Sequence, residues 1–373
     1  LGDEPDDTIV NPENLAHERS TEVCGQCHGV HFFRTSEELE TWKREGYSFR
    51  PGAELADSMA IVRGRFEDND ADVRRRLAQQ PGYLENWFWR DGTVRVAGRE
   101  FNGMLETPCY QRGEMSCLSC HALHRPEDDP RSFQEWTDDQ LGVGTDGRSA
   151  CVPCHTEYAD EERVVEHTRH PADSSGSDCY NCHMPFTSYG LLKAVRSHVV
   201  ASPDVAVSLA TGRPNACNQC HLDRTLRWAA EHLEAWYGIE QPALTTDEET
   251  VPASILWALR GDAAQRALMA WSFGWEDARA ASGTGWMVPF LGVLMADPYD
   301  AVRFIAQRSL RSYPGFREFE QDANMVPGRE EQIELMKRFI VSLRGRTPEP
   351  LLDKVIFDRL LGERDQRPVI LFE

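Results

Sequence analysis

The stretch "PCYQRGEMSCLSCHALH", Pro108 to His124, holds three cysteines and two histidines within seventeen residues. Cys117 and Cys120 form a CxxC pair that is followed at once by His121, and His124 comes three residues later. Cys109 stands apart from this pair. The composition fits four kinds of site: a zinc site, a disulfide, a redox-active thiol pair or a covalent haem anchor.

The other cysteines of the chain repeat the same pattern. Ten of the eleven cysteines form five CxxC pairs, and a histidine follows every pair. The five motifs read "CGQCH" (24–28), "CLSCH" (117–121), "CVPCH" (151–155), "CYNCH" (179–183) and "CNQCH" (217–221). With 12 histidines in 373 residues, chance places one at a given position in about 3% of cases, so five of five is rarer than about one in ten million. The site therefore requires the histidine.

Covalent attachment of c-type haem accounts for all three residues of the motif, because two thiols add to the haem vinyl groups and the histidine binds the iron. Zinc ribbons use CxxC pairs in twos and do not need the histidine, and thioredoxin-like chemistry uses a single CxxC. Five disulfides across two-residue loops would add little stability. The sequence predicts five haems, anchored by Cys24, Cys27, Cys117, Cys120, Cys151, Cys154, Cys179, Cys182, Cys217 and Cys220. The predicted proximal iron ligands are His28, His121, His155, His183 and His221.

Seven further histidines remain as candidates for the second axial position of each iron. That supply could make all five haems bis-histidine, with two histidines to spare, which favours electron transfer over catalysis. We interpret His232 as a structural residue of an amphipathic helix. The predicted distal ligands are His17, His31, His124, His198 and one of the pair His167 and His170.

The composition and the chemistry of the motif bear on location and partners. Covalent haem attachment takes place outside the cytoplasm, so we expect an exported protein, either periplasmic or at the cell surface or extracellular. The formal net charge of -21 argues against a nucleic-acid partner, which would need a basic surface. The most apolar stretch, "MVPFLGVLMA" (287–296), is too short to span a bilayer, so no transmembrane segment is expected. The chain starts at Leu1 without a signal peptide, as a mature or trimmed form would.

Five stretches of the chain carry a resemblance to a known group of proteins. They are "NPENLAHERSTEVCGQCHG", "FRPGAEL", "PCYQRGEMSCLSCHALH", "SGSDCYNCHMPF" and "GRPNACNQCHLDRTLRWAAEHLEAWYG". Together they resemble bacterial multihaem c-type cytochromes in which several CxxCH motifs precede a HEAT-like helical tail. The resemblance covers residues 11–316 and implies an exported electron-transfer protein. It also implies that His124, His198 and one of His167 and His170 are distal ligands, and that Cys109 is a recurrent feature.

The same group often carries further haem motifs before the "NPENL" stretch, where this chain begins. Two explanations fit: a shorter variant, or an upstream part that has been removed. In either case the haem partners of His17 and His31 could belong to another segment or subunit.

The pattern of apolar residues predicts a mainly α fold with extensive coil. We expect a pentahaem cytochrome domain over residues 1–240, whose fold is dictated by haem packing, and a small HEAT-like helical domain over 241–373. Residues 252–274 and 285–315 show the periodicity of paired helices, and two later helices are expected within 329–345 and 349–362.

Electron transfer between exported redox partners, such as other cytochromes, is the favoured function, and no catalytic residue is predicted. One alternative is a multihaem reductase of nitrogen or sulfur oxyanions with one open haem site. Another is a structural subunit of a larger cytochrome complex or polymer, in which His17 and His31 would bind haems across subunit contacts. Cys109 is interpreted as a buried thiol near the second haem, with an iron ligand or an intermolecular bridge as alternatives.

Overall fold

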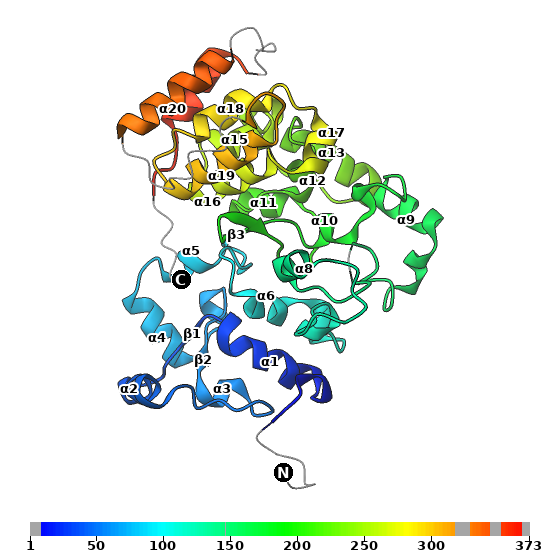
Figure 1. The fold of residues 1–373 in the computed structure, drawn as a ribbon, viewed down its shortest axis with the longest axis vertical. Coiled ribbons are helices and arrows are strands. Elements are labelled where there is room, and N and C mark those ends of the chain that lie inside the picture. Colours follow the sequence, from blue (N-terminus) through cyan, green and yellow to red (C-terminus); the bar gives the residue numbers. More distant parts are fainter. Residues whose placement is uncertain (1–8, 146, 318–328, 344–351, 368–373) are drawn as a thin grey trace. The chain divides into compact units, whose positions relative to one another are not determined.

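The protein was analysed as a computed structural model that describes residues 9–145, 147–317, 329–343 and 352–367 (Figure 1). The described chain is mainly helical, with two small two-stranded sheets, as the sequence predicted for the fold class. It forms two compact units. The first unit takes its described residues from 9–94, 98–184 and 197–201, and the second from 95–97, 185–196 and 202–367.

Near the start of the first unit, helix α1 (His17–His28) contains the whole of the first motif and packs against α6 (Glu100–Glu106). The two helices approach closely because Gly25, inside the motif, has no side chain. A Cβ atom at Gly25 would lie 2.7 Å from Cδ2 of Phe101, which is closer than carbon atoms can pack. Phe101 also joins Phe49, Leu55 and Met59 in a small apolar core. The glycine of "CGQCH" thus serves packing rather than haem chemistry.

The first half of this unit, up to residue 94, consists of short elements that surround the small core. Strands β1 and β2 pair antiparallel, with His31 opposite Ile61. The elements are η1 (Pro12–Asn14), α1 (His17–His28), β1 (His31–Phe32), α2 (Ser36–Glu45), α3 (Leu55–Ser58), β2 (Ala60–Ile61), η2 (Phe66–Asp68), α4 (Ala71–Gln79) and α5 (Tyr83–Trp87).

The second half of the first unit, residues 105–184, has very little apolar core of its own. Among its described residues, the large apolar side chains that are fully buried are Trp136, Val164 and Tyr180. Its elements are α7 (Pro108–Gln111), η3 (Cys117–Ser119), α8 (Phe133–Asp139), η4 (Thr156–Ala159), α9 (Glu161–Thr168), η5 (Ser175–Ser177) and α10 (Cys179–His183). A segment of this length normally needs a larger buried apolar area to remain folded.

The second unit is built differently, as a set of packed helices beside one hairpin. The hairpin turns at Leu191 and Leu192, which both adopt positive φ angles (50° and 56°). The elements are β3 (Ser188–Gly190), β4 (Lys193–Val195), α11 (Val205–Thr211), α12 (Ala216–Cys220), α13 (Leu226–Tyr237), α14 (Thr246–Thr250), α15 (Ala253–Leu259), α16 (Ala263–Ser272), α17 (Glu276–Ser282), α18 (Met287–Leu294), α19 (Asp300–Arg311), α20 (Arg329–Ser342) and α21 (Lys354–Gly362).

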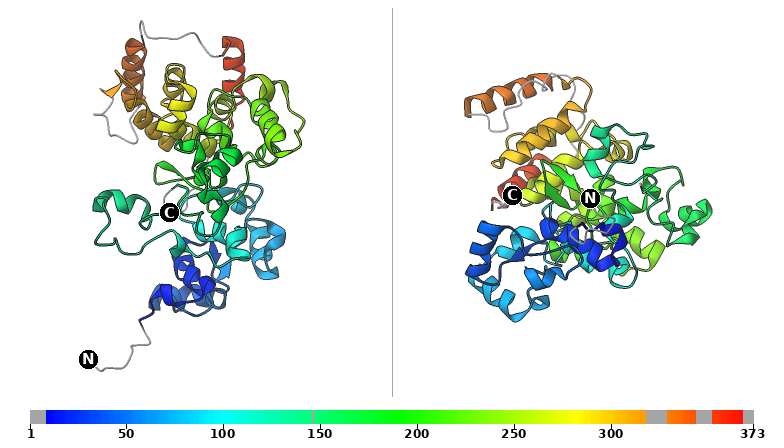
Figure 2. Two further views of the ribbon diagram at one scale, coloured as in Figure 1. Left: turned by 90° about the vertical axis from the view of Figure 1, so that its right-hand side faces the viewer. Right: turned by 60° about the horizontal axis from the view of Figure 1, so that its bottom comes forward.

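Two helical hairpins, α15–α16 and α18–α19, form the core of the second unit and stay grouped in the turned views of Figure 2, coloured yellow-green to orange. The apolar positions predicted for the second hairpin, among them Leu291 and Ile305, are fully buried. A buried ion pair between Arg266 Nε and Asp297 Oδ2, 2.7 Å apart, links α16 to the turn before α19. The predicted paired helices are therefore present, and their HEAT type stays a prediction.

The division into domains at residue 240 also stays a prediction. Helix α12, which carries the fifth motif, belongs to the second compact unit together with the later helices. The other four motifs lie in the first unit.

Candidate haem sites

Each CxxCH motif forms one turn of helix. The first and fourth motifs lie within α1 and α10. In the other three, the backbone N–H of the histidine donates to the carbonyl of the first cysteine, with N···O distances of 2.9, 2.9 and 2.8 Å for His121, His155 and His221. Residues i, i+3 and i+4 of a helical turn share one face. The two thiols and the imidazole of every motif are therefore presented to the same side, as attachment of one haem requires.

His28, His121 and His183, all predicted proximal ligands, have a hydrogen-bonded Nδ1 atom. His121 Nδ1 lies 2.9 Å from the carbonyl oxygen of Asp139, and His183 Nδ1 lies 3.1 Å from that of Ala201. His28 Nδ1 lies 3.0 Å from Oε2 of Glu100. Because these oxygens can only accept, the proton must be on Nδ1, and Nε2 keeps the lone pair that binds iron.

Two of the proximal histidines face a second histidine across a gap that fits one iron atom. The ring centroids of His121 and His198 are 6.2 Å apart, with 18° between the ring planes. Those of His183 and His167 are 6.0 Å apart, with 8° between the planes. An iron held at about 2 Å from one nitrogen of each ring separates the centroids by roughly 6 Å. Both pairs therefore have the spacing of bis-histidine axial ligands.

The side chain of His198 reaches His121 because its backbone is held in place by α6. Thr107 Oγ1 donates a hydrogen bond of 2.6 Å to the carbonyl oxygen of His198. The absence of a side chain at Gly103 also matters, since a Cβ atom there would lie 3.1 Å from the carbonyl carbon of His198. The extended stretch around His198 thus packs directly on α6.

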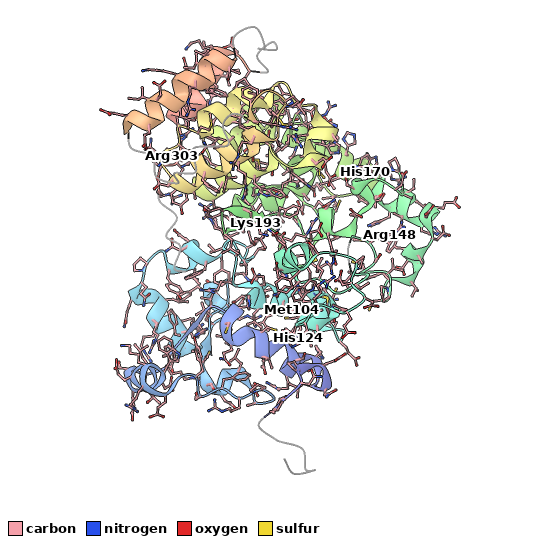
Figure 3. All side chains as sticks on the ribbon, in the orientation of Figure 1. Met104, His124, Arg148, His170, Lys193 and Arg303 are labelled. Carbon is pink, nitrogen blue, oxygen red and sulfur yellow. The ribbon has the colours of Figure 1, made fainter. Side chains whose placement is uncertain are left out.

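The structure places the remaining distal candidates in varied surroundings. His17 faces two acceptors, with Nε2 3.2 Å from the carbonyl oxygen of Tyr110 and Nδ1 3.2 Å from Oε2 of Glu18. To bind an iron, this ring would have to give up one of those contacts. His124 is exposed on the turn after the second motif, where Figure 3 labels it.

His31 and His170 are better prepared to act as ligands. Burial lowers the pKa of His31, which favours the neutral form of the ring, and its Nδ1 atom is buried without a hydrogen-bond partner among the described residues. His170 Nδ1 donates to the carbonyl oxygen of Thr168 at 2.6 Å, so it has the same tautomer as the proximal ligands. Its ring also packs closely on Gly176, where no side chain could fit.

The fifth motif lies beside an aromatic ladder on α13. The His221 ring is 4.9 Å from that of Trp228, which in turn is 4.4 Å from the His232 ring. His232 Nδ1 donates to the carbonyl oxygen of Trp228 at 2.8 Å, a contact within one helix. For His28 and His155, the described residues include no second histidine ring at a separation like that of the two facing pairs.

Thiols of different motifs lie against one another in two places. A hydrogen bond from Cys117, of the second motif, lowers the pKa of Cys24, of the first, to about 7. A hydrogen bond from Cys151, of the third motif, likewise lowers the pKa of Cys179, of the fourth, to about 7. In each pair the hydrogen bond raises the pKa of the other thiol. These contacts place the first and second motifs side by side, and the third and fourth as well.

In the folded chain, Cys109 lies near cysteines of both the second and the third motif. It is partly buried on α7, and its charge would raise the pKa of two motif thiols. The main cause of the raised pKa is burial for Cys120 and the hydrogen bond with Cys179 for Cys151, and the charge of Cys109 adds to both. Cys109 is therefore close to predicted haem-anchoring thiols of two different motifs, Cys120 and Cys151.

Two observations show that the residues present fit haem. The scarcity of apolar core in residues 105–184, where three motifs lie, is expected of a segment whose fold is stabilised by an apolar cofactor. In the same segment, labelled in Figure 3, Arg148 has a buried Nη1 atom without a hydrogen-bond partner among the described residues, close to Cys179. A haem propionate is an anion that such a guanidinium could bind.

The described part of the chain contains no site at which side chains alone would hold a metal ion. No group of three or more His, Cys, Asp or Glu side chains there is arranged to hold a metal ion. A haem iron takes only its axial ligands from the protein, so two facing histidines suffice. Across the described helices, none combines the length and the apolar character needed to cross a membrane.

Comparison with known proteins gave one similarity. No model of a known protein family matches the chain, and no curated protein matches it. Among solved structures, it is similar to the "Outer Cell Wall Cytochrome OcwA", with 16% sequence identity, a TM-score of 0.35 and coverage of 78% of this chain. The chain spans 64% of the length of that cytochrome.

Some residues that shape these sites carry no signal in the sequence. Glu100 lies 72 positions after His28, and the carbonyl groups of Asp139 and Ala201 are backbone atoms that any residue could supply. The sequence reduced the candidates before the fourth motif to His167 or His170, and the structure sets His167 opposite His183. Which of the two histidines binds an iron stays a prediction.

Proposed function

We propose that this protein is an exported electron carrier with five covalently attached c-type haems, which exchanges electrons with other redox proteins. The observation that carries the proposal is the pair of facing histidines, His121 with His198 and His183 with His167, at the spacing that one iron requires. When bound, the haem irons alternate between the ferric and ferrous states and so carry the electrons.

The residues of the chain perform three tasks in this function. The motif thiols fix each haem covalently, so the cofactor cannot dissociate between redox cycles. Facing histidines fill both axial positions, which keeps substrates off the iron and limits its rearrangement during electron transfer. Because Cys24 lies beside Cys117, and Cys151 beside Cys179, the attachment points of neighbouring haems are close to each other, as fast electron exchange requires.

Spectroscopy of the oxidised, haem-loaded protein tests this proposal. We expect five covalent haems per chain and low-spin ferric signals, by absorbance and electron paramagnetic resonance (EPR). We also expect reversible reduction without turnover of nitrite or sulfite. Full haem loading together with catalytic consumption of either oxyanion would contradict a function as a carrier alone.

A second candidate function is reduction of nitrogen or sulfur oxyanions at one open haem. It is favoured by one observation: no second histidine ring faces His28 or His155 among the described residues. An iron with one protein ligand would be high-spin and would bind small ligands. A high-spin signal from one haem per chain that shifts on addition of nitrite or carbon monoxide would support this function instead.

A further inference from the structure

Glu100, the first residue of α6, holds its carboxylate against the proximal ligand of the first motif. Its Oε2 atom lies 3.0 Å from His28 Nδ1, and its other oxygen accepts the backbone N–H of Gly98 at 2.7 Å. The Glu100 side chain is 22% exposed, whereas that of His28 is 57% exposed. Because both carboxylate oxygens have partners, the carboxylate is fixed in its contact with Nδ1.

The contact distinguishes the first motif from the second and the fourth. His121 and His183 donate their Nδ1 protons to backbone carbonyl groups, which are neutral. Of these three imidazoles, only that of His28 donates to a charged acceptor. The histidines of these three CxxCH motifs therefore have two kinds of Nδ1 partner, a carboxylate for His28 and a backbone carbonyl group for His121 and His183.

The kind of Nδ1 partner affects the iron through the imidazole. A carboxylate draws the Nδ1 proton toward itself, so Nε2 becomes a stronger electron donor to the metal. A stronger donor and a nearby negative charge both favour the ferric over the ferrous state. The same haem held by His28 is then harder to reduce than one held by His121 or His183.

We propose that Glu100 is a positioning residue that holds the reduction potential of the first haem below those of the second and fourth haems. The inference rests on the proposed function, because it requires haem at these motifs. It adds an order to the electron path within the first unit.

The Glu100→Gln variant tests the role of the carboxylate. Glutamine keeps the size of the side chain but removes the charge that polarises His28. We expect the midpoint potential of the first haem to rise the most, by about tenfold in the reduction equilibrium, or about 59 mV for one electron. The second haem should show a smaller rise, because the charge of Glu100 also acts on His198. The measurement is a redox titration of the haem-loaded protein monitored by absorbance and EPR.

The matched control is Glu106→Gln, on the same helix. Glu106 is 24% exposed and pairs with Arg63 at 2.6 Å, so this variant also loses one partly buried carboxylate from α6. We expect its five potentials to match those of the wild type. Equal shifts in the two variants, or no shift in Glu100→Gln, would overturn the proposal.

Ligand substitution tests the order of potentials independently, even if Glu100→Gln does not assemble. A methionine in place of an axial histidine raises the potential of that haem and so identifies its midpoint. His28→Met, His198→Met and His167→Met would mark the first, second and fourth haems in turn. We expect the wild-type midpoint of the first to be the lowest of the three. A first-haem midpoint at or above either of the others would refute the proposal, whereas absence of covalent haem in the wild type would refute the proposed function itself.

Discussion

Replacement of His198 by alanine should convert one haem from low-spin to high-spin. The side chain of His198 faces His121 at a centroid distance of 6.2 Å, so its loss leaves the second haem with a single protein ligand. The change should be confined to that haem, because the facing pair of His183 and His167 is built from other residues.

The size of the effect follows from the number of motifs. With five motifs in the chain, the variant should show a high-spin ferric signal from about one-fifth of the iron, with the rest unchanged. Alanine keeps the backbone carbonyl that accepts from Thr107 and keeps the Cβ atom, so the packing on α6 should persist. Added imidazole should restore the low-spin signal by occupying the vacated position.

The assay is EPR spin quantification on protein whose haem content has been measured by mass. His232→Ala serves as the control, because the Nδ1 atom of His232 is bonded within its own helix and we do not assign it to an iron. A fully low-spin His198→Ala protein with five haems would refute the interpretation that facing histidine rings mark the axial ligands.

Three further predictions concern packing, charge and cofactor removal. Gly25→Ala should destabilise the first unit by about 1–3 kcal/mol in thermal unfolding, because the new methyl group overlaps the ring of Phe101, and no loss would contradict the close packing of α1 on α6. Asp297→Asn should lower the free energy of unfolding of the second unit by about 3–5 kcal/mol in denaturant, because it leaves the buried Arg266 without its charged partner. A loss under about 1 kcal/mol would show that water screens the pair. Protein made without haem attachment should lose hydrogen-exchange protection across residues 105–184 while helices α15 to α19 keep theirs, because only the latter have an apolar core of their own, and protection throughout would show that haem is not needed for folding.

The sequence predicted most accurately those features that depend on short-range patterns. The two helical hairpins of the second unit follow from apolar periodicity, and the predicted core residues Val302 and Leu310 are fully buried. The CxxCH motifs have the spacing i, i+3, i+4, and the structure places all three groups on one face of a helical turn, while the attachment of haem stays a prediction. Such patterns are read from neighbouring residues, so no tertiary structure was needed.

The partners of each motif could not be predicted in the same way, because they come from distant parts of the chain. His198 lies 77 positions after His121, and His167 lies 16 positions before His183, so no common spacing identifies a distal ligand. Contacts that shape the sites also include a glycine, Gly103, and backbone carbonyl groups, which leave no chemical signature in a sequence. These choices are made by packing, and packing becomes visible only in the folded chain.

Intact mass spectrometry of this 373-residue chain, produced in a host that attaches c-type haem, tests the central claim most directly. The account predicts a polypeptide heavier than its 42.4 kDa chain by five haems, with the haem retained after extraction by acidified acetone. Retention follows from thioether bonds at all five motifs. A mass equal to the chain alone, a chain with zinc in place of haem, or haem released by the extraction would contradict the account.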